Sequence, residues 1–378
     1  MVQQSKREYL AAILGRYLRA GREYKRKILD EFCEICGYHR KHAIRLLSRR
    51  PHRAKRKPGR SATYGEAERS VLEQIWLAAN RPCSKRLKAA VAIWLPHYER
   101  QEGHLPGPVR ENLLAISARS LDRLMTPVRR KHGMRGRCGT RPGSLLKNLI
   151  PIKTEHADIH KPGVMEADTV AHSGQSLDGN FAWSLTLTDI FSGWTVNRVV
   201  WNKGYDGVRR AIENIESSLP FRITGFHSDN GGEFLNHHLI RYFTERDLPV
   251  DFSRGRPYHK NDTAHVEQKN YTHVRQLLGY SRIENHDLLP AIDELYRAWE
   301  LFNNLFCPSL KLVKKEKIGS RYRKQYDLPQ TPYHRLMSSP DVLEPLKTHM
   351  TELFCNHNPF HLRRYIDRQQ DKILSQLR

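Results

Sequence analysis

The sequence predicts a mixed α/β core, preceded by helical segments and followed by a basic region. Apolar residues recur at helical spacing up to residue 130, whereas runs rich in β-branched and aromatic residues begin only near residue 160. The charge is just as informative, because 64 Lys and Arg against 40 Asp and Glu give a formal net charge of +24. Such a surplus is typical of a protein that binds a polyanion, and nucleic acid is the first candidate.

Length and composition exclude several other classes. A chain of 378 residues predicts two or three domains, and a hydrophobic share of 39% excludes wholesale disorder. No apolar run approaches the roughly 18–20 residues of a membrane span, and the N-terminus lacks the apolar stretch of a signal peptide. No basic amphipathic segment favours a membrane surface as the polyanion. The six cysteines suggest no disulfide framework, so we expect a cytoplasmic protein.

Residues 5–48 are predicted to form a helix-turn-helix DNA-binding domain. The stretch 27–36 has apolar residues at helical spacing, Gly37 interrupts it, and a short basic helix follows over 42–47. The alternative is an ordinary helical hairpin. Two cysteines and two histidines cluster here, but their spacing does not match a usual zinc finger, and we expect the cysteines to pack in a helix. These four residues are Cys33, Cys36, His39 and His42.

Residues 49–65 form a basic linker that cannot bury a core. Its cations are tentative DNA contacts, and the alternative is a solvated connector. The tentative contacts are Arg53, Lys55, Arg56, Lys57 and Arg60.

A second helical DNA-binding domain is predicted over 66–130. We expect Pro96 and the stretch 103–108 to break its helices, and Ser117 to cap a helix that begins after it. A second basic linker follows over 131–158. At the other end of the chain, residues 305–378 form a basic C-terminal region whose fold the sequence does not predict, except that 358–378 has a helical pattern.

The segment 159–304 is predicted to be the α/β core. Three consecutive strands precede alternating helices and strands, which is the order of an RNase H-like domain. The expected strands are 164–171, 181–189, 194–200, 222–227 and 249–253, and the expected helices are 207–217, 232–246 and 262–278.

Three acidic residues occupy informative positions in this core. Asp168 lies inside the first strand, where a buried carboxylate is costly unless it binds something. Asp229 follows the strand 222–227, and Glu267 lies on the predicted helix 262–278. Carboxylates are the ligands that Mg²⁺ prefers, and two such ions about 3.5–4 Å apart catalyse phosphodiester cleavage. The pattern therefore predicts a magnesium site, with Mn²⁺ as a possible substitute.

Four motifs in residues 164–280 resemble the catalytic core of retroviral integrases and bacterial insertion-sequence transposases. They are Glu166-Ala-Asp-Thr, Leu187-Thr-Asp-Ile-Phe-Ser-Gly-Trp, Ser228-Asp-Asn-Gly-Gly-Glu-Phe, and Arg256-Pro-Tyr-His-Lys-Asn-Asp-Thr-Ala-His-Val-Glu-Gln-Lys-Asn. The resemblance implies that Asp168, Asp229 and Glu267 are the catalytic, metal-binding acids. The interval between the last two, residues 230–266, is slightly longer than the family's common spacing, and Asp262 is the alternative third ligand.

The resemblance also implies the activity. A DDE-type transposase or integrase cleaves transposon ends and joins the 3′-hydroxyls to target DNA, so the implied partners are terminal inverted repeats and target duplex. Because two ends must be joined together, we expect a homo-oligomer, a dimer or larger, associated with a bacterial nucleoid. The alternatives are an RNase H-like nuclease without strand transfer and a DNA-binding regulator without catalysis.

Other residues near the acids have more than one interpretation. Lys260 and Lys269 are tentative DNA contacts, and the alternative is a solvated helix face. Asp189 is expected to cap the turn after its strand, with metal binding as the alternative. Glu166 is expected to support Asp168 if the strand is regular, because alternate residues then share a face.

Overall fold

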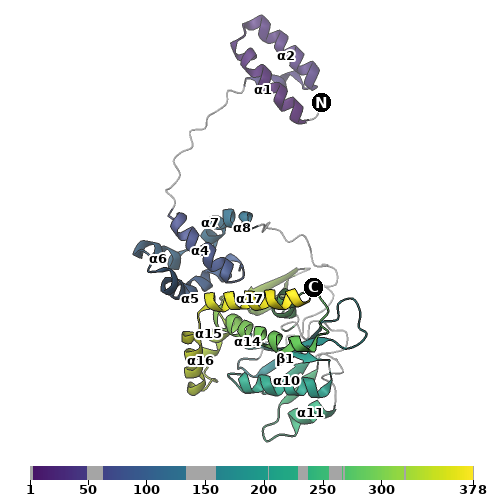
Figure 1. Cartoon of the computed structure of the whole chain (residues 1–378). Coiled ribbons are helices and arrows are strands. Elements are labelled where there is room, and N and C mark those ends of the chain that lie inside the picture. The colour runs from purple at the N-terminus through teal and green to yellow at the C-terminus, as the bar shows by residue number, and fades with distance from the viewer. Residues whose placement is uncertain are drawn as a thin grey trace. The chain divides into compact units, whose positions relative to one another are not determined.

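The computed structural model describes residues 3–48, 63–132, 159–202, 204–228, 237–254, 266, 269–318 and 321–377 (Figure 1). The chain divides into two compact units, Met1–Ala62 and Thr63–Arg378, and each is described by itself. Most of both predicted basic linkers lies outside the described residues.

The N-terminal unit is a bundle of three helices, α1 (Gln3–Arg19), α2 (Arg22–Cys36) and α3 (Arg40–Leu47). Gly37 ends α2 with a φ of 65° and donates its backbone N–H to Cys33, a conformation that glycine adopts without a steric penalty. The order of helix, glycine turn and short helix agrees with the expected pattern. Phe32 is fully buried at the centre of the unit, whereas Ile35, counted above as part of the apolar pattern, is 44% exposed.

In the described residues of the second unit before the sheet, 63–132, there are five helices: α4 (Glu66–Ala78), α5 (Ser84–Glu102), α6 (Gly107–Ala115), α7 (Ala118–Leu124) and α8 (Thr126–Lys131). Ser117 caps α7 as expected, because its Oγ accepts the backbone N–H of Ser120 at 3.1 Å. The expectation for Pro96 was wrong, since α5 continues through it. Proline in a helix costs about 3 kcal/mol. Trp94 and Leu95 beside it are fully buried, and each contributes about 1.5–3 kcal/mol of hydrophobic free energy.

A five-stranded mixed sheet forms the middle of this unit. Its strands are β1 (Val164–Ala171), β2 (Ala182–Asp189), β3 (Thr195–Trp201), β4 (Gly225–Ser228) and β5 (Asp251–Arg254), in the order β3-β2-β1-β4-β5. The first three are antiparallel neighbours, β4 runs parallel to β1, and β5 runs parallel to β4. Helices α10 (Tyr205–Ser218) and α11 (His237–Thr244) lie between the later strands in the sequence. The structure therefore confirms the predicted strand order along the chain.

The helix predicted over 262–278 is described mainly from residue 269 onward. It contains a π-helical stretch, η2 (Asn270–Arg275), followed by α13 (Gln276–Leu278). A short 3-10 turn, η3 (His286–Leu288), then leads into the long helix α14 (Leu289–Phe306). The side chains of α14 bind the free edge of β3, because Asn304 accepts the N–H of Thr195 at 3.0 Å and donates to its carbonyl at 2.9 Å.

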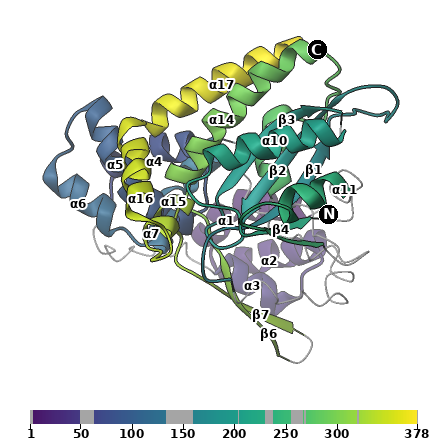
Figure 2. The ribbon, with the colours of Figure 1, turned by 90° about the horizontal axis from the view of Figure 1, so that it is seen from below.

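The C-terminal region contains a hairpin, β6 (Leu312–Ile318) and β7 (Arg321–Tyr326), and three helices. These are α15 (Pro332–Met337), α16 (Glu344–Asn356) and α17 (Pro359–Gln376). Helix α17 lies alongside α14 (Figure 2). No helix in the described part of the chain is long and apolar enough to cross a membrane.

The helices before and after the sheet share its hydrophobic core instead of having cores of their own. Trp94 of α5 donates its indole N–H to the carbonyl of Phe306 at 2.9 Å and packs edge-on against Phe302 and Phe360. Segments predicted separately, 66–130 and 305–378, therefore belong with the sheet to one compact unit. The DNA-binding roles predicted for the two N-terminal segments stay predictions.

Candidate functional site

The candidate site is built on β1, which presents Glu166 and Asp168 on one face two residues apart. Glu166 is fully buried and Asp168 is partly buried. Opposite them on β2 stand Thr188, paired with Glu166, and Thr186, paired with Asp168. Because strand pairing places these residues side by side, the face that carries the acids is polar on both strands.

Asp168 is held by two neutral donors. Its Oδ1 accepts the backbone N–H of Thr169 at 2.8 Å, and its Oδ2 accepts the side-chain amide of Asn270 at 2.5 Å. Asn270 begins the π-helical stretch η2, and such stretches are frequent at functional sites. The contact fixes the orientation of the carboxylate against the segment that follows Glu267. Asn270 belongs to the fourth sequence motif, but the sequence analysis assigns it no role. The feature that could have identified it is its position three residues after Glu267.

Glu166 joins the strand to the residue just before Glu267. Its Oε2 accepts the backbone N–H of Val266 at 3.0 Å, and Val266 is itself fully buried. A buried carboxylate that accepts a backbone N–H across 100 positions of sequence fixes two distant segments together. Glu166 thus contacts the segment that leads into Glu267, and its expected support of Asp168 stays a prediction.

The end of β4 lies beside the middle of β1. Ser228, the residue before Asp229, is paired with Ala167, the residue before Asp168. His227 is paired with Glu166, and its Nδ1 is 3.0 Å from the Oγ of Ser253 on β5. The strand that leads into Asp229 is therefore the direct parallel neighbour of the strand that carries Asp168.

The other expected site residues divide into two groups. Lys269 is described, whereas eight lie outside the described residues: Asp229, Glu267, Lys260, Arg53, Lys55, Arg56, Lys57 and Arg60. The rival ligand Asp262 lies outside them too. Within the described part of the chain, no group of three or more His, Cys, Asp or Glu side chains is arranged to hold a metal ion.

Lys269 has a partly buried side chain. Burial lowers its pKa to about 8, and the nearby cations Arg86 and Arg335 act in the same direction. These come from α5 and α15, so three cationic side chains from distant parts of the sequence gather next to η2.

Asp189 caps the turn after β2, as expected. It is fully buried and accepts three hydrogen bonds, from the N–H of Gly163 at 2.9 Å and from the N–H and Oγ of Ser192 at 2.7 and 2.6 Å. Burial raises the pKa of Asp189 while these hydrogen bonds oppose the rise. Its oxygens are therefore used to close the β2–β3 turn.

The cysteine and histidine cluster of the N-terminal unit has structural contacts. Cys36 is buried in the hydrophobic core at the end of α2, and His39 caps α3 by accepting the N–H of Lys41 at 3.3 Å. His42 packs edge-on against the ring of Tyr38. The expectation that Cys36 packs in a helix agrees with this arrangement.

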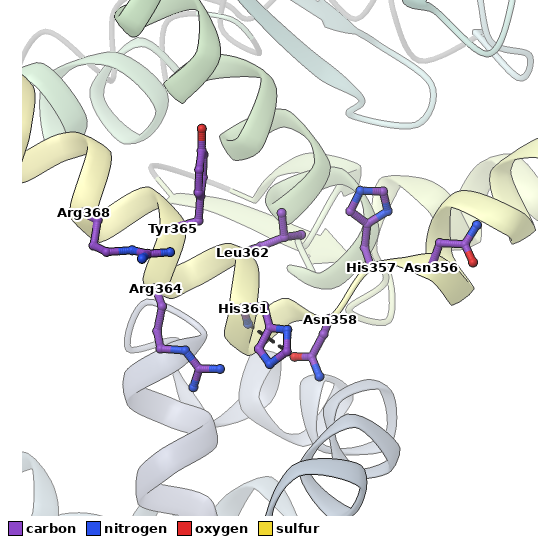
Figure 3. Close-up of a pocket in the computed structure, with 8 residues that line it drawn as sticks. All are labelled: Asn356, His357, Asn358, His361, Leu362, Arg364, Tyr365 and Arg368. Carbon is purple, nitrogen blue, oxygen red and sulfur yellow. Dashed lines mark hydrogen bonds between the residues drawn. The ribbon is translucent and has the colours of Figure 1, made fainter.

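A pocket of about 480 Å³ lies at the junction of α16 and α17 (Figure 3). Its lining includes His357, His361, Arg364 and Arg368, and no residue of β1 or η2. It is therefore separate from the candidate site around Asp168.

Comparison with known proteins gives one close relative. The chain is 39% identical over 335 residues to the uncharacterized protein y4rM of Sinorhizobium fredii, a match that covers 87% of this chain and 94% of the relative. The chain belongs to the family of y4rM. No model of a known protein family matches the chain.

Among solved structures, the chain is similar to the catalytic core domain of BIV integrase. The identity is 16%, and the match covers 45% of this chain and 91% of that domain, with a TM-score of 0.29.

Proposed function

We propose that this chain is a DDE-type transposase or integrase, which cleaves transposon ends and joins the freed 3′-hydroxyls to target DNA. One observation carries the proposal: the segments that lead into Asp229 and Glu267 both meet β1 next to Asp168. Ser228 pairs with Ala167, and Val266 donates its N–H to Glu166 at 3.0 Å. Asp229 and Glu267 directly follow Ser228 and Val266 in the sequence.

The sheet supports the same proposal. Strand order β3-β2-β1-β4-β5, with three antiparallel neighbours followed by two parallel additions, is the arrangement expected for an RNase H-like core. Ligands of open α/β sheets gather where parallel strands end, and β4 ends at Ser228 directly before Asp229. The proposed site thus combines a mid-strand acid with one at a strand end and one on a following helix.

The proposed donor set fits a hard divalent cation. Asp168, Asp229 and Glu267 supply carboxylate oxygens, which Mg²⁺ and Mn²⁺ prefer. Asp168 is already oriented by the neutral donors Thr169 and Asn270. When bound, a pair of such ions stabilises the charge that develops on the attacking and leaving oxygens.

The proposed reaction has two balanced steps. In the first, a water oxygen forms a bond to phosphorus, the bond to the 3′-oxygen breaks, and that oxygen takes up a proton. In the second, the new 3′-hydroxyl attacks a target phosphodiester, and a target 3′-oxygen leaves. One phosphodiester bond forms as one breaks, so the joining step requires no nucleotide cofactor.

The partners follow from the charge and the reaction. The +24 net charge supports duplex DNA as the substrate, and the three-helix N-terminal unit is the proposed reader of the terminal inverted repeats. Joining two ends in one event requires two active sites, so we propose a dimer or larger assembly.

The test uses Asp168→Asn and Asp229→Asn in the full chain, with the exposed Asp247→Asn as the matched control. DNA flanking the gene supplies the end sequences for Mg²⁺-dependent cleavage and strand-transfer assays. Both site variants should lose cleavage and keep DNA binding, because each removes a metal ligand and leaves the basic surface intact, while the control keeps both. Cleavage that survives in either site variant would refute the site. Cleavage without joining in the unaltered chain would identify a nuclease instead.

A further inference from the structure

The hairpin formed by β6 and β7, residues 312–326 and here called the basic hairpin, has an unusual charge. Its sequence contains six cations and one acid, Glu316. In the described part of the chain, its strands form a sheet of two that pairs with no other strand. The cations are Lys314, Lys315, Lys317, Arg321, Arg323 and Lys324.

The strands of the hairpin by themselves contribute little stability. Glu316, which is paired with Arg323, is the only acid in the sequence of the hairpin. An isolated two-stranded hairpin is also only marginally stable in water. Val313 and Ile318 are 59% and 58% exposed, so the hairpin gains little from burying its apolar side chains. The excess of positive charge on the hairpin therefore favours an anionic partner outside the chain.

The base of the hairpin is nevertheless firmly held. Lys311 donates its N–H to Asp327 at 2.6 Å and its ammonium to the carbonyl of Phe191 at 2.9 Å. Arg335, only 8% exposed, donates to Asp327 at 2.9 Å and to the carbonyl of Ser192 at 3.1 Å. These contacts fix the hairpin to the turn between β2 and β3, while its strands extend beyond the helices and the five-stranded sheet (Figure 2).

The same turn relates the hairpin to the candidate site. Asp189, which closes the turn, is paired with Met165 on β1, three positions before Asp168. At about 3.3 Å per residue, this separation along the strand is about 10 Å. The base of the hairpin is thus fixed to a turn whose first residue, Asp189, pairs with the strand that carries Asp168.

We propose that the basic hairpin lies in the major groove of the duplex that flanks the cleaved bond, with Arg323 and Lys324 contacting phosphates. The major groove is about 12 Å wide and admits a two-stranded β-ribbon. Both side chains are exposed on β7. The inference rests on the proposed function, since it identifies how that site receives its DNA.

The experiment measures duplex affinity against salt concentration for the full chain. The variant is Arg323→Ala/Lys324→Ala, and the matched control, Arg368→Ala/Lys372→Ala, removes the same charge from exposed positions on α17. Each lost phosphate contact lowers the slope of log affinity against log salt by about 0.9. The hairpin variant should therefore lose about 1.8 from the slope, while the control keeps it. Exchanging the cations, Arg323→Lys/Lys324→Arg, should retain the slope.

The outcomes separate the two proposals. If the unaltered chain binds duplex DNA and the hairpin variant keeps its slope, the inference is wrong and the proposed function stands. A slope lost equally by the control also overturns it, because the effect is then one of net charge. A chain that binds single-stranded RNA in preference to duplex DNA through the hairpin contradicts both. If the hairpin variant loses the same amount of slope in an Asp168→Asn background, the hairpin acts in DNA binding, independently of cleavage.

Discussion

Asp168 shows how a single carboxylate is prepared for a role before any ligand arrives. The backbone N–H of Thr169 and the amide of Asn270 hold one oxygen each. Both donors are neutral, and they orient the carboxylate. Glu166 has a structural role instead, since it is fully buried and accepts the backbone N–H of Val266. Two acids on one strand face thus differ in role because their partners differ.

Asn270 is expected to position Asp168. Replacing it in Asn270→Ala removes a hydrogen bond to a charged group, worth about 1.5–3 kcal/mol, so cleavage should fall at least about tenfold. The divalent-ion concentration at half-maximal rate should also rise, because a carboxylate with one orienting hydrogen bond fewer binds the ion less well. Titrating cleavage against Mg²⁺ checks both effects. Tyr271→Ala is the control, since this neighbour is 57% exposed, and an equal effect there would contradict the assignment.

At the scale of elements, β3 shows how the sheet protects its edge. An edge strand exposes unpaired backbone groups that invite association with other chains. Here Asn304 binds both the N–H and the carbonyl of Thr195, and Asp293 accepts the N–H of Val199 at 3.3 Å. Helix α14 therefore completes the hydrogen bonding of the strand beside it. The free edge is closed by side chains instead of by a sixth strand.

Adjacent asparagines on α14 provide a test of this arrangement. Asn304→Ala leaves two buried backbone groups of Thr195 without their partners, at about 1–3 kcal/mol each. Its unfolding free energy should fall by at least about 2 kcal/mol. Asn303→Ala should cost under about 1 kcal/mol, because Asn303 only donates to a carbonyl within its own helix. Denaturant unfolding compares the two, and equal losses would show that Asn304 does not matter to the edge.

At the scale of the whole molecule, the second unit is held together by aromatic contacts between distant segments. His97 on α5 packs against Phe306 of α14 and Phe354 of α16, and it is 2% exposed. Its Nδ1 forms no hydrogen bond with any described residue. Burial lowers the pKa of His97 to about 4, with Arg100 acting in the same direction. The same cause lowers the pKa of His172 to about 3 and that of His273.

These histidines predict a loss of stability in acid. Between pH 6.5 and 4 the unfolded chain binds a proton at His97 that the folded chain does not, so folding stability falls as the pH falls through this window. The full effect of His97 is about 3 kcal/mol, at about 1.4 kcal/mol per pH unit. In His97→Gln the unfolding free energy should depend less on pH over this range. Denaturant unfolding at pH 7 and pH 4.5 measures it, and the exposed His349→Gln should leave the dependence unchanged.

Much of the element order could be predicted from local sequence. The strand over 164–171 begins and ends where its β-branched pattern predicts, and Ser117 and Asn358 begin their helices through local capping bonds. Where side chains repeat with a period of 2 or 3.6, the pattern reports the local conformation directly. The position of Asp168 within a strand likewise followed from the sequence, whereas the catalytic roles of Asp168, Asp229 and Glu267 rest on the resemblance.

Tertiary structure decided which distant segments meet. No local sequence pattern predicts that Trp94 hydrogen-bonds Phe306, 212 positions later, or that Glu166 accepts the backbone N–H of Val266. The continuation of α5 through Pro96 has the same origin, because the buried side chains around it outweigh the local penalty. Periodicity indicates which face of its helix or strand a side chain occupies. Hydrophobic burial is non-directional, so it determines which segments pack together only when the whole unit is folded. That is why the elements followed from the sequence and their shared core did not.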